Sequence, residues 1–364
     1  MDADKQARHL VISVYLAFIR GYNCCMSSAP QTKAPSPAII FETLNAHVRT
    51  AALRGAIELD LFTAIAEGNT SVDTIAKRIH ASEKGTRVLC DFLTIDGLLT
   101  KQDQRYGLTV DSAAFLNRHS PAYMGTVARF LGVPQLTANF HDLAAVVRKG
   151  GTLTEEGTLE AENPIWVEFA HSMAPMMRMP ADLIAELVAA EIPGECKVLD
   201  IAAGHGLFGI AVAQHNPKAH IAAQDWAPVL AVAEENAEKA GVAGRHSKIP
   251  GSAFDVDFGS GYHAVLITNF LHHFDIPTNE SLLRKVHAAL APGGMVVTFE
   301  FIPNEDRISP PMDASFSMMM LGSTPHGDAY TFSEYDRMFR NAGYARNEMR
   351  ELAPTPQRVI VSYK

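Results

Sequence analysis

A strand that runs directly into a glycine-rich turn constrains this chain more than any other feature. The segment from Val198 to Gly209 reads VLDIAAGHGLFG, and its glycines have the G-x-G-x-x-G spacing typical of dinucleotide-binding loops. Glycine at such positions lets the backbone turn tightly and approach a ligand or a helix closely. The motif predicts a nucleotide-like ligand at the end of a strand, but it does not identify that ligand.

Strand and helix patterns alternate after this point. Apolar runs typical of buried strands are KVLDIAA, HIAAQDW, HAVLITNFL, MVVTFEF and QRVIVSYK. Helical periodicity recurs between them in LFGIAVAQHN, VLAVAEENAEKAG, SLLRKVHAALA and FSEYDRMFRNAGY. The alternation predicts an α/β fold in which a Rossmann-like parallel sheet carries helices on both faces.

The chain before this sheet has a different pattern. Helical periodicity begins at Ala38, and two further helices begin after Ser71 and Ser82, which are typical N-cap residues. The segment LLTKQDQRYGLT then predicts a β-hairpin, which completes the element order of a winged helix. Residues 38–120 hold nine basic and ten acidic residues, so they lack the basic face of a DNA-binding winged helix. We expect an interaction module there.

Charge and cysteine content exclude several further classes. The net charge of −9 argues against a nucleic-acid partner that binds through a broad basic face. The four cysteines form no C-x-x-C pair, and His171, His263 and His326 lack the spacing of metal ligands. We therefore expect no bound metal and a reducing, cytoplasmic location.

The N-terminal residues 1–37 are expected to be an extension and linker. Ten apolar residues, Leu10–Ile19, follow Lys5 and Arg8 as in a signal peptide, but they are too few to span a bilayer and no cleavage site follows. The segment SSAPQTKAPSP has the composition of a flexible linker. We predict a winged-helix-like domain with connecting helices over 38–160, the sheet domain over 161–364, and no membrane contact.

Two carboxylates near the glycine loop help to identify the ligand. Asp225 ends the second strand, nineteen residues after Gly206, where a carboxylate can bind the ribose of either NAD or S-adenosylmethionine. Asp200 lies four residues before Gly204, and a carboxylate there repels a pyrophosphate but attracts an ammonium group. This pattern favours S-adenosylmethionine, which carries an ammonium group and no phosphate.

A segment near the C-terminus also favours S-adenosylmethionine as the ligand. The segment LAPGGMVVTFEF combines a helix end, a Pro-Gly-Gly turn and a strand that carries Glu300, and it resembles the corresponding part of class I methyltransferases. From about Ala38 to Lys364 the chain resembles the O-methyltransferases of the plant caffeic-acid, acetylserotonin and bacterial polyketide type. In that family a winged-helix dimerisation domain precedes the methyltransferase domain. The resemblance implies a homodimer formed through the N-terminal domain, S-adenosylmethionine as cofactor and a small-molecule acceptor.

The resemblance also implies which residues bind the cofactor. The family loop D-x-G-G-G-x-G matches DIAAGHG, in which two glycines are replaced by alanine. The family segment G-D-[MF]-F matches GSAF, in which the usual aspartate is Ser252. The cofactor-binding residues implied in this way are Asp200, Ala202, Gly204, Gly206, Asp225, Trp226, Ser252, Ala253, Phe254, Thr268 and Asn269.

The same resemblance implies the catalytic residues. The family motif H-D-W matches His272-His273-Phe274, which makes His272 the general base and Glu300 the residue that orients it. A second supporting glutamate of the family falls on Ala329 and is absent. A neutral imidazole can remove the proton of a phenol or enol, which is a poor nucleophile until it is deprotonated. The alternative for either histidine is a packed or capping role, which is the favoured interpretation for His273.

Aromatic and methionine side chains are candidates for the acceptor pocket. Methionine adapts to flat or irregular ligands. The residues predicted to contact the acceptor are Trp166, Phe169, Met173, Met176 and Met319, and packing between domains is the alternative for most of them. The predicted activity is O-methylation of a phenolic or enolic hydroxyl. The alternatives are a C- or N-methyltransferase of the same fold and a nicotinamide-dependent oxidoreductase.

Overall fold

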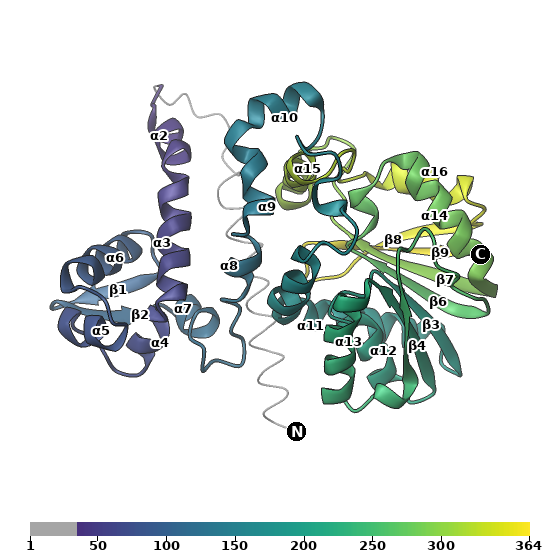
Figure 1. Ribbon diagram of the computed structural model, residues 1–364, viewed down its shortest axis with the longest axis horizontal. Helices are drawn as coiled ribbons and strands as arrows, with labels where there is room; N and C mark the ends of the chain where they lie inside the picture. The colour runs from purple at the N-terminus through teal and green to yellow at the C-terminus, as the bar shows by residue number, and fades with distance from the viewer. Residues whose placement is uncertain (1–34) are drawn as a thin grey trace. The chain divides into compact units, whose positions relative to one another are not determined.

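The structure is a computed structural model that describes residues 35–364. The apolar stretch Leu10–Ile19 and most of the predicted linker lie outside the described residues. The chain divides into two compact units, one ending at Arg129 and one beginning at Phe130 (Figure 1). In the part of the chain that is described, no helix has both the length and the apolar character needed to cross a membrane.

The N-terminal unit contains short helices and one hairpin. Its elements are α2 (Ala38–Leu44), α3 (Ala46–Glu58), α4 (Leu61–Ala66), α5 (Val72–Arg78), α6 (Glu83–Ile95), β1 (Leu99–Gln102), β2 (Arg105–Leu108) and α7 (Val110–Phe115). Strands β1 and β2 pair antiparallel as the sequence predicts. Both expected N-caps are present, because Ser71 forms a capping box with Thr74 and the Ser82 hydroxyl accepts from the Gly85 N–H at 3.1 Å.

The C-terminal unit begins with helical segments and continues as an α/β domain. Helix α8 (Val127–Phe130) crosses the division between the units. The elements that follow are α9 (Pro134–Thr137), η1 (Ala138–Asp142), α10 (Leu143–Lys149), η2 (Gly157–Leu159), α11 (Ile165–Glu191), β3 (Cys196–Ile201), α12 (Leu207–His215), β4 (Ala219–Asp225), α13 (Ala227–Lys239), η3 (Ala243–Arg245), β5 (His246–Pro250), β6 (Tyr262–Thr268), η4 (Leu271–His273), α14 (Ile276–Ala289), β7 (Leu290–Glu300), α15 (Pro311–Ser323), α16 (Phe332–Asn341), β8 (Arg346–Glu351) and β9 (Arg358–Tyr363).

Seven strands form one sheet in the order β5-β4-β3-β6-β7-β9-β8. The five strands from β5 to β7 are parallel, whereas β9 runs antiparallel to both β7 and β8. The predicted parallel sheet is therefore confirmed for these five strands, and β9 departs from it by running antiparallel to both of its neighbours. Numbered within the sheet, the order is 3-2-1-4-5-7-6, which differs from the 3-2-1-4-5-6 order of dinucleotide-binding domains by the antiparallel insertion.

Helices cover both faces of this sheet. Alternate residues of β6 face opposite sides, so that Ala264 and Leu266 pack in a cluster with α11 and α12, and Val265 and Ile267 pack with α14 and α16. Figure 1 shows the two helical layers on either side of the strands. Strands β3, β4, β6, β7 and β9 are mostly buried, which explains why their sequences read as continuous apolar runs rather than as alternation.

Candidate active site

The glycine loop connects β3 to α12 and requires glycine at two positions. Gly204 and Gly206 have φ values of +56° and +73°, which lie in the left-handed region that glycine adopts without strain. A Cβ atom on Gly206 would also lie 2.9 Å from the Cβ of Ala233 in α13. The sequence motif therefore allows both the tight turn and the close approach of loop and helix.

Four neighbouring strands end at this edge of the sheet with polar side chains. Asp200 lies near the end of β3, Asp225 and Thr268 are the last residues of β4 and β6, and Glu300 is the last residue of β7. The strand register places these ends side by side in the order β4, β3, β6 and β7. The fold thus brings the predicted cofactor-binding and catalytic carboxylates to one edge.

The two aspartates differ in their hydrogen bonds. Oδ1 of Asp225 accepts from the Trp226 N–H at 2.7 Å, and Oδ2 accepts from the Gly204 N–H at 2.8 Å. Oδ2 of Asp200 accepts from the Gly209 N–H at 3.0 Å, but Oδ1 is buried and has no hydrogen-bond partner among the described residues. Burial raises the pKa of Asp225 to about 6, and burial together with the charge of Asp225 raises the pKa of Asp200 to about 7.

Two residues other than glycine adopt a left-handed backbone conformation beside these carboxylates. Ala202 follows β3 and Asn269 follows β6, and each has a φ of +53°. The Asn269 N–H donates to the Phe299 carbonyl at 2.8 Å, and its side-chain oxygen accepts a short hydrogen bond from Gln357. These two hydrogen bonds hold Asn269 in a backbone conformation that is unfavourable for a residue other than glycine.

The loop after β5 holds the next group of predicted residues. The Gly251 N–H donates to the Asp225 carbonyl at 3.0 Å, which joins this loop to the end of β4. The Ser252 hydroxyl accepts from the Phe254 N–H at 3.2 Å, and the carbonyls of Ala253 and Phe254 accept from Nζ of Lys285. Phe254 is 37% exposed. The loop therefore presents an aromatic ring and a hydroxyl near Asp225.

His272 and Glu300 form a buried pair. His272 lies in η4, directly after β6, and its Nδ1 is 2.5 Å from Oε2 of Glu300. Oε1 of Glu300 accepts from the backbone N–H groups of Phe270 and Leu271 at 2.8 and 2.9 Å. An ionised carboxylate can only accept, so Nδ1 is the donor in this contact, and in a neutral imidazole the lone pair then lies on Nε2. This arrangement agrees with the orienting contact that the sequence implies for Glu300.

Helix α15 places an aromatic side chain, Phe316, against His272, a contact that the sequence does not predict. The ring of Phe316 meets the ring of His272 edge-on, with centroids 4.8 Å apart, and stacks on Phe301 at 4.1 Å. Ala329, where the resemblance implies that a second glutamate is absent, is fully buried. No spacing rule connects Phe316 to His272, which is forty-four residues earlier in the chain, so only the tertiary structure identifies this contact.

Three of the five residues predicted to contact the acceptor, Trp166, Phe169 and Met173, pack in one cluster, and Met176 and Met319 lie elsewhere. Trp166 packs on Phe169 and on His273, with ring centroids 5.9 and 5.3 Å apart, and Met173 packs in the same small cluster as Trp166. Phe169 also lies over the glycine loop, since a Cβ on Gly204 would be 3.6 Å from its ring. Met176 packs instead against the sheet core, and Met319 lies half-buried on α15.

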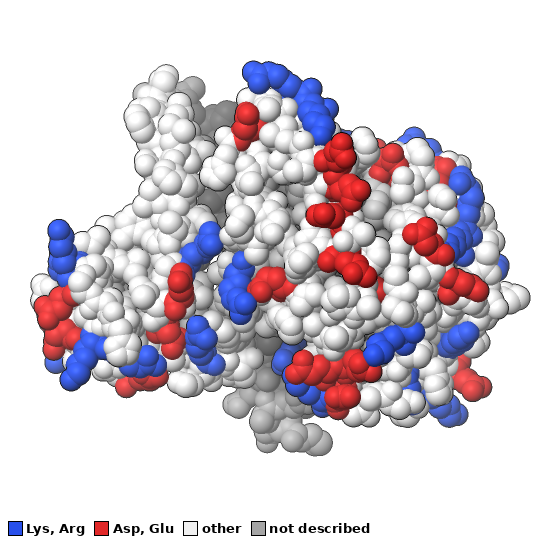
Figure 2. All heavy atoms as spheres, in the orientation of Figure 1, with Lys and Arg blue, Asp and Glu red and all other residues white. Residues whose placement is uncertain are grey.

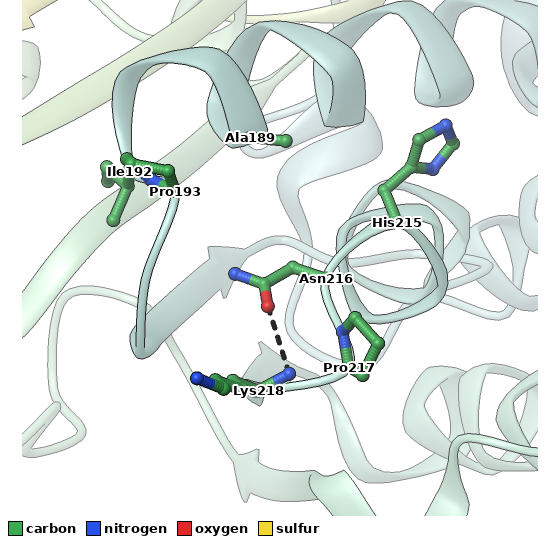
Figure 3. A pocket seen from close by; sticks show the side chains of 7 residues that line it. All are labelled: Ala189, Ile192, Pro193, His215, Asn216, Pro217 and Lys218. Carbon is green, nitrogen blue, oxygen red and sulfur yellow. Dashed lines mark hydrogen bonds between the residues drawn. The ribbon is translucent and has the colours of Figure 1, made fainter.

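A surface hollow lies at the opposite end of the strands. It is lined by Ala189, Ile192, Pro193, His215, Asn216, Pro217 and Lys218, which precede β3 and β4 (Figure 3). The Asn216 side chain accepts from the Lys218 N–H at 2.9 Å in this hollow. None of the predicted site residues lines it, and its chemistry is that of a helix-to-strand connection rather than of a catalytic centre.

The chain matches two protein-family models. Residues 140–345 match the model described as an O-methyltransferase domain, and residues 41–118 match an O-methyltransferase dimerisation domain. Among curated proteins, 3-hydroxy-5-methyl-1-naphthoate 3-O-methyltransferase from Streptomyces sahachiroi is 27% identical over 336 residues. That match covers 90% of this chain and 95% of the relative.

The chain is also similar to solved structures of methyltransferases. A Nostoc punctiforme protein named as a candidate O-methyltransferase is 54% identical, with a TM-score of 0.88 and coverage of 91% of this chain and 100% of that chain. Human N-acetylserotonin methyltransferase, solved in complex with S-adenosylmethionine, is 20% identical, with a TM-score of 0.79 and coverage of 92% and 99%. At that identity the second likeness shows the fold alone.

Proposed function

Since this chain belongs to the O-methyltransferase family, we propose that it transfers a methyl group from S-adenosylmethionine to a hydroxyl oxygen of a small aromatic or enolic acceptor. The observation that carries the proposal is the His272–Glu300 pair at the edge of the sheet where Asp200 and Asp225 also lie. A base is required there only if the acceptor must lose a proton to react.

The residues present fit the cofactor. The buried Oδ1 of Asp200 lacks a partner among the described residues, and an ammonium group bound directly or through water would supply one. Asp225 ends β4 at the position of a ribose-binding carboxylate, and the left-handed Gly204 and Gly206 form the tight turn of the loop beside it. Trp226, Phe254 and Thr268 complete the proposed binding surface.

The proposed mechanism assigns one proton transfer to this chain. When bound, S-adenosylmethionine supplies an electrophilic sulfonium methyl whose leaving group is a neutral thioether. Nε2 of His272 removes the acceptor's hydroxyl proton as the oxygen attacks, and Glu300 stabilises the resulting imidazolium through Nδ1. The two N–H groups that anchor Glu300 keep the imidazole in a fixed orientation, which supports the alignment that an in-line transfer requires.

The alternatives fit less well. A nicotinamide-dependent oxidoreductase would place a pyrophosphate beside the buried Asp200, and its sheet would lack the antiparallel β9. Methylation of carbon or nitrogen uses the same cofactor site. A neutral amine already has a lone pair with which to attack, so its methylation does not require the proton transfer that the His272–Glu300 pair is suited to perform.

We also propose that the N-terminal unit forms a homodimer. Residues 41–118 match the dimerisation model, and α2 exposes a row of apolar side chains to water. Ile39, Ile40, Phe41 and Leu44 are between 59% and 71% exposed. Such a contiguous apolar helix face is typical of a protein interface, and a second copy of this chain is the partner that the dimerisation match supports.

Replacement of His272 by alanine tests the proposed mechanism. We expect kcat to fall by about 10²–10⁴-fold, with S-adenosylhomocysteine affinity unchanged in calorimetry. The loss should shrink as pH rises toward the pKa of the acceptor, because solution then removes the proton. His220→Ala, an exposed histidine at the start of β4, is the matched control and should retain full activity. Near-normal turnover by His272→Ala at neutral pH would contradict a base-assisted transfer.

A further inference from the structure

The short helix η4, which carries His272, is held weakly by its own hydrogen bonds. It has only three residues. The His273 N–H donates to the Phe270 carbonyl at 3.2 Å, and the Phe274 N–H donates to the Leu271 carbonyl at 3.3 Å. A single helical turn with such long bonds is marginal in isolation. The orientation of the His272 ring therefore depends on groups that bind this turn from other elements.

Asn279 of α14 binds the turn on both sides of His272. Its side-chain amide donates to the Leu271 carbonyl at 2.8 Å and to the Phe274 carbonyl at 3.2 Å. Asn279 is fully buried, and its Oδ1 has no hydrogen-bond partner among the described residues. An apolar side chain would avoid the cost of that unpaired oxygen, which is about 1–3 kcal/mol. The two bonds to the turn are what an apolar side chain could not provide.

The segment before α16 binds the same turn. The Tyr330 hydroxyl donates to the Phe274 carbonyl at 2.6 Å, and the Asp328 N–H donates to the His272 carbonyl at 3.0 Å. Gly327 permits this close approach, because a Cβ there would lie 2.3 Å from the His272 carbonyl oxygen. Tyr330 is 5% exposed, so little water competes for its contact.

The bonds from outside hold the turn more tightly than its own bonds do. Glu300 accepts from its N–H groups at 2.8 and 2.9 Å, while α14 and the segment before α16 donate to its carbonyls. All of these bonds except the longer Asn279 contact are shorter than both internal bonds. We propose that Asn279 and Tyr330 are positioning residues for methyl transfer, which aim Nε2 of His272 at the acceptor through the backbone of η4. The inference rests on the proposed function, because it concerns the alignment of the proposed base.

Two single variants test the positioning role. Asn279→Ala removes both amide donors, and Tyr330→Phe removes only a hydroxyl. We expect each to lower kcat by about 5- to 50-fold at pH 7, because the base is less well aligned, with acceptor KM and S-adenosylhomocysteine affinity changed by less than about twofold. The loss should shrink as pH rises toward the pKa of the acceptor, as for His272→Ala, because solution then removes the proton.

Asn216→Ala and Tyr344→Phe are the matched controls. The Asn216 amide donates to the Gly194 carbonyl at 2.8 Å, at the opposite end of the strands. The hydroxyl of the buried Tyr344 donates to the Leu283 carbonyl at 3.2 Å. Both variants should lose some thermal stability and keep wild-type kcat. A fall in kcat as large as that of the test variants would contradict a role specific to η4.

Combination with His272→Ala decides whether the two residues act through the base. Adding Asn279→Ala or Tyr330→Phe to His272→Ala should leave the residual kcat unchanged, because no base remains to be positioned. A further loss as large as in wild type would make the role merely structural. Wild-type kcat in both single variants would overturn the inference while the effect of His272→Ala upheld the proposed function.

Near-normal turnover by His272→Ala would instead contradict the proposed function, and this inference would fail with it. Thermal unfolding shows whether each variant retains the fold. If Asn279→Ala does not fold, Tyr330→Phe alone decides, since it removes one hydroxyl and leaves the ring in place.

Discussion

The contact proposed between the buried carboxyl group of Asp200 and the ammonium group of the cofactor predicts that cofactor affinity depends on pH. Its pKa is raised to about 7 by burial and by Asp225, so below pH 7 the free protein holds a proton that an ammonium ligand must displace. S-adenosylhomocysteine affinity should therefore rise by up to about tenfold per pH unit between pH 5.5 and 7 and level off above. Calorimetry at four pH values measures the affinity for S-adenosylhomocysteine as a function of pH.

The Asp200→Asn variant is the control for this pH dependence. It should bind S-adenosylhomocysteine weakly and with a much flatter pH profile, because the amide cannot ionise. The raised pKa of Asp225, about 6, should leave a residual slope at the acidic end. Wild-type affinity that stays constant from pH 5.5 to 8 would contradict the assignment of Asp200 to the ammonium group.

Ala202 and Ala203 stand where the family loop D-x-G-G-G-x-G has glycine. We expect replacement by glycine to change the free energy of unfolding in opposite directions at the two positions. Ala202 has a φ of +53°, which costs a residue with a Cβ about 1–2 kcal/mol, whereas Ala203 is buried and is absent from the residues with positive φ. Ala202→Gly should raise the free energy of unfolding by up to about 1 kcal/mol, after subtraction of the added chain entropy. Ala203→Gly should lower it. Urea unfolding of both variants checks the signs, and destabilisation by Ala202→Gly would contradict the strain.

Some site residues could be placed from the sequence and others could not. Asp200, Asp225 and Glu300 could be predicted to lie together because the ends of parallel strands meet at one edge. The environment of Phe169 could not be predicted, because helical spacing gives the face of a helix but not the element that the face meets. Its ring lies over Gly204, so the side chain predicted to contact the acceptor also borders the proposed cofactor site.

Helix α15 connects the proposed site to a buried acid. Phe316 on this helix meets His272, and Asp313 in its first turn is 1% exposed, with neither carboxyl oxygen hydrogen-bonded among the described residues. Burial raises the pKa of Asp313 to about 7 in spite of the opposing charge of Arg358. The folded state therefore holds this proton more tightly than the unfolded state. The associated stability is present below about pH 4 and is lost as pH rises to 7.

The Asp313→Asn variant tests this linkage. The uncharged amide should raise the free energy of unfolding at pH 8 by up to about 4 kcal/mol and change it little at pH 4. Thermal unfolding at both pH values measures the difference, with Asp103→Asn in the exposed turn between β1 and β2 as the control. Equal unfolding temperatures for Asp313→Asn and wild type at pH 8 would show that Asp313 is not a buried ionisable group.

Strands β5 and β8 were not predicted from the sequence, and the reason is physical. Strand β5 reads HSKIP and β8 reads RNEMRE, and both are edge strands with few apolar residues. Edge strands need no continuous apolar run, and charged residues there limit edge-to-edge association. Without β8 the direction of β9 could not be inferred. The short connection between β8 and β9 can join only antiparallel strands, since a parallel pair needs a long crossover.

The change in sequence pattern along the chain predicted two domains. The structure divides the chain between Arg129 and Phe130, and the domain boundary predicted at residue 160 stays a prediction. Figure 2 shows acidic and basic side chains interspersed on the face in view. Location in the cell also stays a prediction, because neither charge nor fold determines it.

The apolar face of α2 makes the oligomeric state testable. Light scattering at micromolar concentration should give twice the 39.5 kDa chain mass for wild type. The double variant Ile40→Glu, Phe41→Glu should give the single-chain mass, because burial of two charges would remove the apolar driving force for association. These side chains are 59% and 61% exposed within one chain, so circular dichroism should show an unchanged fold.

Val110→Glu provides the matched control for the dimer. Val110 is 86% exposed but lies on α7, so this charge should leave the mass at twice 39.5 kDa if association depends on α2 rather than on any exposed apolar residue. A wild-type protein that scatters as a monomer would contradict the homodimer. A double variant that remains dimeric would place the interface on another surface of the N-terminal unit, because two buried glutamates in an interface core are incompatible with association at micromolar concentration.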